Sequence, residues 1–332
     1  MPPRNRGNSS SPDFTVRILY IGTGDIGAPS LNWLAGSGHE IAAVFTQPDK
    51  PAGRKMELQP SPIKLLAQKL GIPVFQPVKL RAPEAVEQVS SLGADLIVVM
   101  AYGQILPKGV LDAARIACLN LHASILPRHR GAAPIQAAIL EGDRETGVTV
   151  MYMDAGLDTG DILLIHGTLI RDDDTGGTLH DRLAEIAPGA LAEAISLIEA
   201  GKAPRIPQDN TRATYAGKLG REDGKIRWER RAEDIGRQVR AMNPWPGAFT
   251  ELADREGVAR KLKVFGVDVI DTQSGTPGVV LSSGAEGILV GCASGALLLR
   301  DVQWEGKRRM PMRDFLNGMP VPPGTILHGN RS

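Results

Sequence analysis

Cysteine is scarce in this sequence, and long apolar runs are missing. Cys118 and Cys292 are the only two thiols among 332 residues, and they lie far apart without CxxC spacing. This argues against a disulfide framework and against a cysteine zinc site. No apolar run approaches the roughly 20 residues that span a bilayer, and residues 1–12 lack the apolar centre of a signal peptide. We therefore expect a cytoplasmic protein with no membrane-spanning segment and with both cysteines buried.

The net charge is close to zero, but it is unevenly distributed. The formal charge of +1 combines 20 Lys and Arg against 15 Asp and Glu from Pro204 onward with 18 against 22 before it. A basic bias in one half is compatible with a polyanionic partner, and equally with an ordinary solvated surface. Charge alone leaves nucleic-acid binding open.

The length and the 42% hydrophobic content predict two domains. Residues 1–14 are rich in Pro, Asn, Arg and Ser, so we expect a mobile tail. Short apolar runs then alternate with helix-like stretches, which predicts an α/β domain with a largely parallel, Rossmann-like sheet over residues 15–201. Its strands are expected at Val16–Ile21, Ile41–Phe45, Leu96–Met100, Cys118–Leu121 and Val148–Met153.

The second half of the chain has a different pattern. An amphipathic helix is expected over about Thr178–Gly201, interrupted or kinked at Pro188, and residues 202–214 are predicted to form a linker. A helix around Ala232–Met242 then precedes short strands punctuated by Gly and Pro, which is typical of a small OB-like β-barrel, here over residues 215–330. Those strands are expected at Leu262–Val267, Gly278–Leu281, Gly287–Val290 and Ala296–Asp301.

The first predicted strand runs into a literal GxGxxG sequence, Gly22-Thr-Gly24-Asp-Ile-Gly27, the pattern of dinucleotide-binding enzymes. The supporting acidic residue is missing at the tip of the second strand, where the sequence is Phe45-Thr46-Gln47. Lys50 or Arg54 could instead meet a 2′-phosphate. The other interpretation, which we favour, is a tight strand-to-helix turn that needs small residues.

The richest polar segment includes the fourth predicted strand. Asn120 and His122 are two residues apart in that strand, so both side chains leave the same face, at the carboxyl end where α/β sheets place ligands. A second polar cluster follows the next strand and can bring the Asp158 carboxylate to the same edge. Each residue alone could simply be a cap or a buried hydrogen-bonded group. Their combination favours catalysis.

These three side chains suit formyl transfer to an amine, which passes through a tetrahedral oxyanion. The Asn120 amide can donate to the oxyanion, and the His122 imidazole can donate or accept a proton. The Asp158 carboxylate can orient the imidazole and relay protons through water. No metal is required for this reaction.

The same segments resemble the methionyl-tRNA formyltransferase family. The resemblance is carried by Asn120-x-His122, Ser124-Ile125-Leu126-Pro127, Arg130-Gly131-Ala-Ala-Pro134 and Gly156-Leu-Asp158-Thr-Gly160. It implies 10-formyltetrahydrofolate as the formyl donor and Asn120, His122 and Asp158 as the catalytic residues. The residues implied to contact the folate are Ser124, Ile125, Leu126, Pro127, Met100, Tyr102, Gly103 and Gln104.

Two further segments favour a tRNA acceptor. The loop Phe45–Arg54, continuing to Pro60-Ser61-Pro62, resembles the family's insertion into the tRNA acceptor stem, which implies that Lys50 and Arg54 bind tRNA. Downstream, the segments Tyr215-Ala-x-Lys218 and Arg240-Ala-Met-Asn243-Pro244-Trp245-Pro246 resemble the start of its tRNA-binding barrel. The resemblance implies formylation of initiator methionyl-tRNA in translation initiation, and we expect a monomer.

Three alternatives are weighed against this interpretation. Formylation of a sugar amine or nucleotide would use the same catalytic residues but would need neither the Arg54 loop nor a basic barrel. A nonenzymatic RNA-binding protein on a degenerate enzyme scaffold is disfavoured by the intact Asn120, His122 and Asp158. A nicotinamide oxidoreductase comes last, because nothing in the second half resembles a hydride-acceptor domain.

Overall fold

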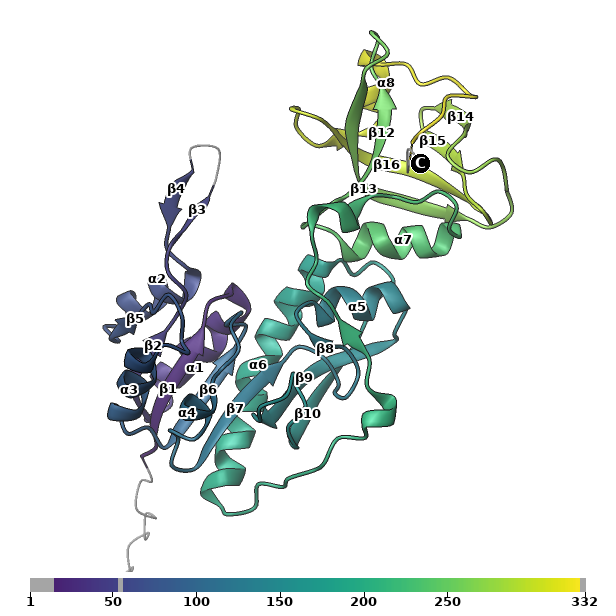
Figure 1. Cartoon of the computed structure of the whole chain (residues 1–332). Helices are drawn as coiled ribbons and strands as arrows, with labels where there is room; N and C mark the ends of the chain where they lie inside the picture. The colour runs from purple at the N-terminus through teal and green to yellow at the C-terminus, as the bar shows by residue number, and fades with distance from the viewer. Residues whose placement is uncertain (1–14, 53–55, 329–332) are drawn as a thin grey trace, which may run out of the picture. The chain divides into compact units, whose positions relative to one another are not determined.

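A computed structural model describes residues 15–52 and 56–328. The expected N-terminal tail and Arg54 lie outside the described residues. The chain divides into two compact units (Figure 1). The first contains the chain up to His122 together with Val148–His166 and Ala184–Gln208. The second contains Ala123–Gly147, Gly167–Leu183 and the chain from Asp209 onward.

The first unit is organised around a seven-stranded sheet of order β10-β9-β7-β6-β1-β2-β5. Its strands are β1 (Arg17–Gly22), β2 (Glu40–Phe45), β5 (Val74–Phe75), β6 (Leu96–Met100), β7 (Ala117–His122), β9 (Glu145–Tyr152) and β10 (Ile162–Leu169). The pairs β1–β2, β1–β6, β2–β5 and β6–β7 are parallel, and β9 runs antiparallel to β7. The predicted largely parallel sheet is confirmed.

Burial explains why apolar runs form the central strands. All residues of β6 and β7 are buried, as expected where both faces of a sheet are covered. The helices assigned before β9 are α1 (Ala28–Gly36), α2 (Pro62–Lys69), α3 (Pro83–Ser91), α4 (Lys108–Leu111) and α5 (Pro134–Glu141), with a short 3-10 turn η1 (Asp25–Gly27) before α1. Helix α2 begins at a Ser61 cap that accepts from the Lys64 backbone N–H at 3.1 Å, with Pro62 in its first turn, an arrangement that favours helix initiation.

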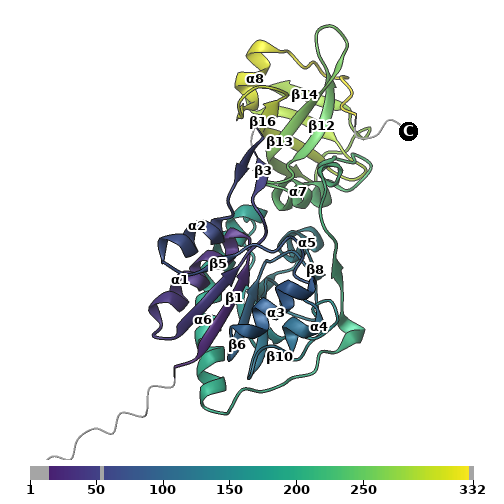
Figure 2. The ribbon, with the colours of Figure 1, turned by 60° about the vertical axis from the view of Figure 1, so that its left-hand side comes forward.

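Two short strands form a hairpin outside the main sheet. Strands β3 (Lys50–Ala52) and β4 (Glu57–Gln59) pair antiparallel. The hairpin extends away from the end of the seven-stranded sheet in both ribbon views (Figures 1 and 2). Met56 and Leu58 are exposed on it, at 67% and 68%. The described parts of the loop that resembles the family's insertion therefore form a projecting hairpin with apolar side chains in solvent.

The second unit contains an antiparallel sheet of order β12-β13-β16-β15-β14, with β17 paired to β16. The strands are β12 (Ala248–Ala253), β13 (Ala259–Ile270), β14 (Val280–Gly284), β15 (Gly287–Gly291), β16 (Ala296–Trp304) and β17 (Met310–Pro311). Isolated bridges join Ile326 to Val279, next to β14, and His328 to Glu251 in β12. The same terminal segment thus pairs at both edges of the sheet, which supports the predicted barrel.

The barrel core is apolar and includes one face of helix α7 (Ala232–Ala241). Ile235 and Val239 on this helix pack with Leu262 and Val264 of β13 and with the fully buried Trp228. The remaining elements are η2 (Asn210–Arg212), η3 (Arg221–Gly224), α8 (Met312–Gly318) and a two-residue parallel pair, β8 (Arg130–Gly131) with β11 (Tyr215–Ala216).

The predicted helices are also present. Helix α6 spans Gly176–Glu199 and continues through Pro188, and α7 coincides with the helix expected around Ala232–Met242. Both cysteines are buried, as expected, and burial raises the pKa of the Cys118 thiol to about 12. Among the described residues, no helix is long and apolar enough to cross a membrane.

The GxGxxG segment is explained by packing. A Cβ at Gly22 would lie 2.9 Å from the Met100 carbonyl oxygen, and one at Gly27 would lie 2.4 Å from the Tyr20 hydroxyl oxygen. That hydroxyl is buried and donates to the Gly27 carbonyl at 2.8 Å. A side chain at either glycine would displace these contacts, so two of the three glycines are accounted for without a ligand.

We predict that this segment confers no binding of nicotinamide cofactors. The expected outcome of titrating the protein with NADH or NADPH is no saturable change in nucleotide fluorescence in the micromolar range, because the strand tip at Thr46-Gln47 lacks the acidic residue that binds the ribose. Saturation at micromolar cofactor would show that the glycine turn is a dinucleotide site after all.

Candidate active site

Asn120 and His122 lie together at the end of β7. Their side chains are almost fully buried, with 9% and 6% of each residue exposed. Pairing of Asn120 with Met151 and of His122 with Thr149 fixes the register between β7 and β9. The alternation of side chains in a strand puts both on one face, as the sequence pattern predicts.

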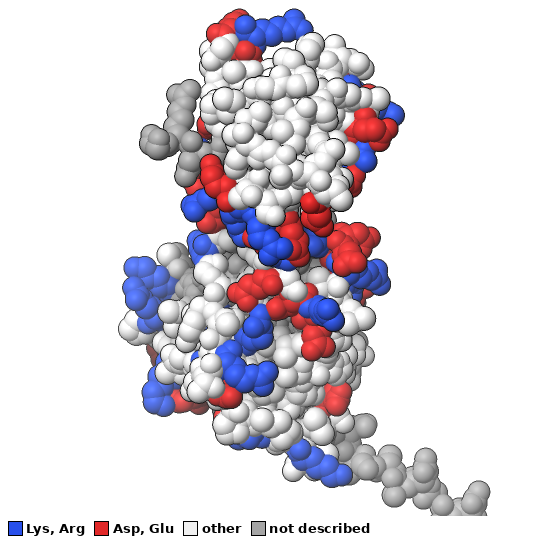
Figure 3. Space-filling model, turned by 90° about the vertical axis from the view of Figure 1, so that its right-hand side faces the viewer, with Lys and Arg blue, Asp and Glu red and all other residues white. Residues whose placement is uncertain are grey.

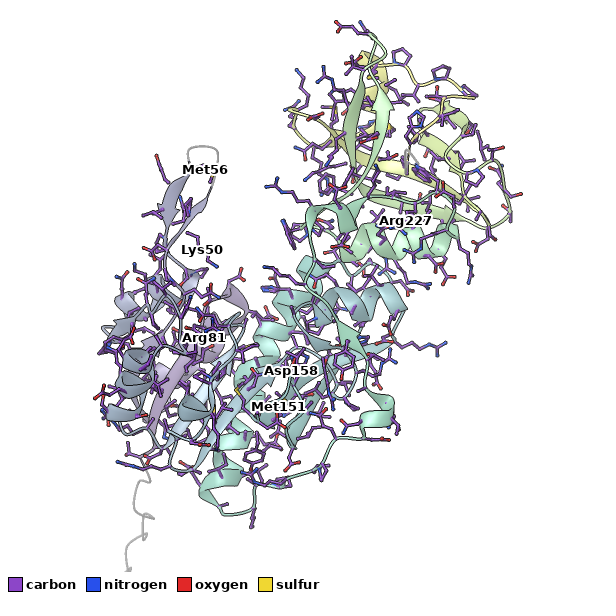
Figure 4. The ribbon with its side chains drawn as sticks, viewed as in Figure 1. Lys50, Met56, Arg81, Met151, Asp158 and Arg227 are labelled. Atoms are coloured by element: carbon purple, nitrogen blue, oxygen red, sulfur yellow. The ribbon has the colours of Figure 1, made fainter. Side chains whose placement is uncertain are left out.

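Asp158 comes to the same place from the loop after β9 (Figure 4). Its Oδ1 lies 3.4 Å from the Asn120 amide nitrogen, and its Oδ2 lies 3.7 Å from His122 Nδ1. The structure therefore brings together an amide, an imidazole and a carboxylate. Both distances are longer than tight hydrogen bonds, which is common in catalytic sites without substrate.

The loop that carries Asp158 is held by its own polar groups. Asp154 Oδ1 accepts from the Gly156 N–H at 3.0 Å and from the Thr159 hydroxyl at 2.7 Å. A Cβ at Gly160 would lie 1.7 Å from the Tyr152 carbonyl oxygen. Glycine is thus required for the close approach of this loop to the end of β9.

Gln208 also fixes this loop, and the sequence pattern gives no sign of it. Its side-chain amide donates to the carbonyl oxygens of Asp158 at 2.9 Å and Gly160 at 2.7 Å. Nearby, Ile206 pairs with Ile162 of β10, so the backbone around Gln208 is held against the same sheet. Composition alone indicates only a linker here.

Three loops at the ends of β2, β5 and β6 are tied together by glutamine side chains. Gln47 Nε2 donates to the Tyr102 carbonyl at 2.6 Å. Gln104 accepts from the Leu80 N–H at 3.0 Å and donates to the Val78 carbonyl at 3.3 Å. The side chains of Gln47 and Gln104 therefore link the loops at this edge of the sheet, next to residues implied to line a folate pocket. We call these linked loops the glutamine frame.

The implied folate-lining residues differ in exposure. Met100 is buried in β6, and its sulfur accepts from the Ser30 hydroxyl at 4.0 Å. Tyr102 is buried, its hydroxyl has no hydrogen-bond partner among the described residues, and burial raises the pKa of this hydroxyl to about 12. Gly103 has φ of +79°, and the side chain of Gln104 makes the two contacts above. At this strand end, the groups that a ligand can reach are therefore backbone groups and the side chain of Gln104.

The Ser124–Pro127 turn follows β7 directly and belongs to the second unit. Ser124 is buried, and its hydroxyl donates to the Arg128 carbonyl at 2.7 Å. Ile125 is partly exposed, whereas Leu126 is buried and precedes a cis peptide bond to Pro127. The hydrogen bond from Ser124 to the Arg128 carbonyl therefore closes the turn.

A cluster suited to metal ligation lies just beyond this turn. His129, Glu141 and Asp143 have ligand atoms within 4.8 Å of one another. However, Arg128 donates to Glu141 at 2.9 Å and to Asp143 at 2.6 Å, and His129 Nε2 lies 2.6 Å from Asp143. The two carboxylates are already paired with cations or hydrogen-bond donors, so we interpret the cluster as an ion-pair network.

Of the residues implied to contact tRNA, Lys50 lies on the projecting hairpin. Lys50 is exposed at the base of β3 and donates to Gln47 Oε1 at 2.6 Å (Figure 4). The neighbouring Asp49 is hydrogen-bonded to Lys64 and Gln76, which lowers its pKa. Arg54 lies outside the described residues.

Four exposed side chains beside the glutamine frame were not singled out by sequence reasoning. Val78 and Ile105 are large apolar residues with 77% and 84% exposure. Lys79 and Arg81 are exposed, and no ion pair engages them in the described part of the chain. Isolated exposed residues in loops carry no periodic signal, so only their placement beside Gln104 makes them candidates.

Comparison with known families identifies the class of protein. A protein-family model described as formyl transferase matches residues 16–195. A second family model, described as formyl transferase, C-terminal domain, matches residues 218–320. Together they cover most of the chain and coincide with the parallel-sheet region and the barrel. The protein is a transferase of the formyl transferase class.

Curated relatives narrow the class further. A methionyl-tRNA formyltransferase of Geotalea uraniireducens is 46% identical over 312 residues, which cover 94% of this chain and 98% of the relative. One of Akkermansia muciniphila is 49% identical over 92% of this chain and 97% of the relative. The chain belongs to the methionyl-tRNA formyltransferase family.

Solved structures with this fold are more distant in sequence. HypX from Aquifex aeolicus, solved in complex with tetrahydrofolic acid, is similar over 91% of this chain, with a TM-score of 0.60 and 19% identity. The chain spans about half of that protein, 47% of its length. At this identity the likeness shows the fold alone.

Proposed function

We propose that this protein transfers the formyl group of 10-formyltetrahydrofolate to the amino group of methionine on initiator tRNA. The observation that carries the proposal is the meeting of Asn120, His122 and Asp158 at one sheet edge, in a chain that belongs to the family. Transfer forms a bond from the amine nitrogen to the formyl carbon and breaks the bond from that carbon to the folate nitrogen. One proton leaves the amine, and one reaches the departing nitrogen.

Each of the three residues is proposed to serve one requirement of this reaction. The Asn120 amide donates to the oxyanion that forms on the formyl oxygen. His122 exchanges protons with the reacting nitrogens, and Asp158, 3.7 Å from its Nδ1, orients the ring and relays a proton through water. The near-complete burial of Asn120 and His122 strengthens these interactions by excluding water. None of these steps requires a metal.

The frame at the ends of β5 and β6 is proposed to hold the folate donor. Val78 and Ile105 offer apolar contact for an aromatic ring, and Lys79 offers positive charge to the carboxylates that a folate carries. Ser124, Ile125, Leu126, Pro127, Met100, Tyr102, Gly103 and Gln104 are retained as the folate-lining set. A formyltransferase fold solved with tetrahydrofolic acid supports this choice of donor.

The basic part of the second unit is proposed to hold the tRNA. Several exposed cations follow β11 in the sequence, and they form no ion pairs with the residues that the structure describes. They are Lys218, Arg221, Arg227 and Arg230. Such unpaired charges can replace the counterions of a phosphate backbone. We propose that the protein acts in the cytoplasm, since charged initiator tRNA is used there. We also propose that it acts as a monomer.

A transfer assay tests the proposed function. The protein is incubated with 10-formyltetrahydrofolate and charged initiator tRNA, the ester is hydrolysed, and the released amino acid is analysed. We expect formylmethionine to appear in proportion to enzyme and time. Active, folded protein that yields only methionine would refute the proposal.

Arg54 provides a test of the tRNA part of the proposal. From the resemblance of its loop, we expect Arg54→Ala to lower kcat/KM for charged tRNA by at least about tenfold, or ~1.4 kcal/mol, while folate binding changes little. Salt should weaken tRNA binding to the parent more than to the variant, because one phosphate contact has been removed. Equal tRNA kinetics and equal salt slopes in both proteins would exclude this role and favour a small acceptor.

A further inference from the structure

A hollow of about 400 Å³ lies in the second unit, and none of its lining residues belongs to the proposed active site. Its apolar walls come from the end of α5, from the segment after β10 and from β13, and they are Ile139, Ile170, Val267 and Val269. Its charged lining consists of Arg144, Arg171, Arg237, Arg240, Asp143, Asp172 and Glu233. Charged side chains of both signs also gather in a band across the face shown in Figure 3.

Helix α7 presents two arginines to the hollow. Arg237 is held in place by Glu233 at 2.7 Å and by Asp234, and its buried Nε has no hydrogen-bond partner within the part of the chain that the structure describes. Arg240 is half-buried, which lowers its pKa, and its Nη1 donates to the Asp174 carbonyl at 3.1 Å.

Two more arginines lie on exposed parts of the lining. Arg144 and Arg171 are exposed, and their guanidinium groups form no ion pair in the described part of the chain. Two of the three carboxylates of the lining are already paired, one of them with an arginine of the lining itself. Asp143 is paired with Arg128 and lies 2.6 Å from His129 Nε2, and Glu233 is paired with Arg237 and Arg231. The hollow therefore has an excess of unpaired positive charge.

This combination defines the chemistry of a ligand. Several guanidinium groups around one space are suited to phosphate, which they bind in a bidentate manner. The apolar walls suit a flat, weakly polar group, and the volume is within the usual range of small-molecule sites, about 300–1,000 Å³. Asp172 is left to accept a hydrogen bond from a hydroxyl or an amino group. A nucleoside phosphate has all of these parts.

We propose that this hollow is a binding site for a nucleoside phosphate. The phosphates lie between Arg144 and Arg171. The base lies against the walls formed by Ile170, Val267 and Val269. The site is separate from formyl transfer and does not depend on it.

Calorimetric titration of the full chain with ADP, GDP, pyrophosphate and adenosine tests this site. We expect at least one nucleotide to bind with a Kd below about 1 mM, at least about tenfold more tightly than pyrophosphate, and adenosine not to bind. The double variant Arg144→Ala/Arg171→Ala should weaken nucleotide binding at least about tenfold. The matched variant Arg308→Ala/Arg313→Ala removes the same charge from exposed positions outside the hollow and should bind as the parent does.

Three results would overturn the proposal. They are no binding of either nucleotide, equal binding of pyrophosphate and nucleotide, or equal losses in the two double variants. A second measurement, kcat/KM for charged tRNA, shows whether the hollow binds a free nucleotide or the phosphates of tRNA. We expect it to stay within about twofold of the parent in Arg144→Ala/Arg171→Ala. A loss of tRNA kinetics without nucleotide binding would assign the hollow to tRNA instead.

Discussion

Replacing His122 or Asn120 with alanine is expected to lower turnover by roughly 10²-fold or more while the protein stays folded. Removing a general acid–base group typically costs 10²–10⁴-fold, and removing one oxyanion donor about 10²–10³-fold. Both side chains are almost fully buried at the end of β7, where water replaces them poorly. Single-turnover rates with charged tRNA and saturating donor measure the chemical step directly.

A matched histidine variant separates catalysis from general damage. His166 lies in β10, where its Nε2 is 2.8 Å from an exposed Glu193 carboxylate. His166→Ala should therefore keep the parent turnover within about twofold, since exposed pairs contribute little. Near-normal rates in purified His122→Ala or Asn120→Ala would remove that residue from the mechanism, provided that circular dichroism shows the fold to be intact.

Asp158→Asn is expected to be comparably damaging, at about 10²-fold or more in turnover. Asp158 has φ of +54°, a left-handed conformation that Asn adopts more readily than most residues. The substitution therefore keeps the shape of the loop and its contacts with Gln208, but it removes the negative charge 3.7 Å from His122 Nδ1. The loss then reports on charge, because an amide neither stabilises the protonated imidazole nor relays a proton.

The neighbouring Asp161 supplies the control for this variant. Its carboxylate lies on the same segment, 3.9 Å from Arg205 and partly exposed, so Asp161→Asn removes the same charge nearby. We expect near-parent turnover from it and an altered pH–rate profile only from Asp158→Asn. An unchanged profile in Asp158→Asn would contradict a role in orienting His122.

Patterns with a short period predicted most of the framework. The apolar runs of β1, β6 and β7 are buried on both faces, which is why they read as continuous strands. The spacing of Asn120 and His122 placed both side chains on one face of β7. Those features depend on neighbours in the sequence, so the sequence alone is sufficient to predict them.

Features that depend on distant contacts had no such signal. Gln208 reaches Asp158 across 50 positions, and Arg130-Gly131 pairs with Tyr215-Ala216 through two residues on each side. A single amide or a two-residue strand has no periodicity to detect. The meeting of Asp158 with His122 was predicted from sheet topology, but its distances come only from the folded loop. The hollow beside α7 requires the placement of three separate segments.

The choice of acceptor is the central claim, and one competition assay tests it most directly. Purified protein receives labelled 10-formyltetrahydrofolate together with charged initiator tRNA and an amino-sugar nucleotide in the same vessel. We predict that label enters the methionyl-tRNA and that the sugar remains unlabelled, because the basic part of the chain from Pro204 onward favours a polyanionic tRNA. Label that accumulates in the sugar amine while the tRNA remains unformylated would contradict this account.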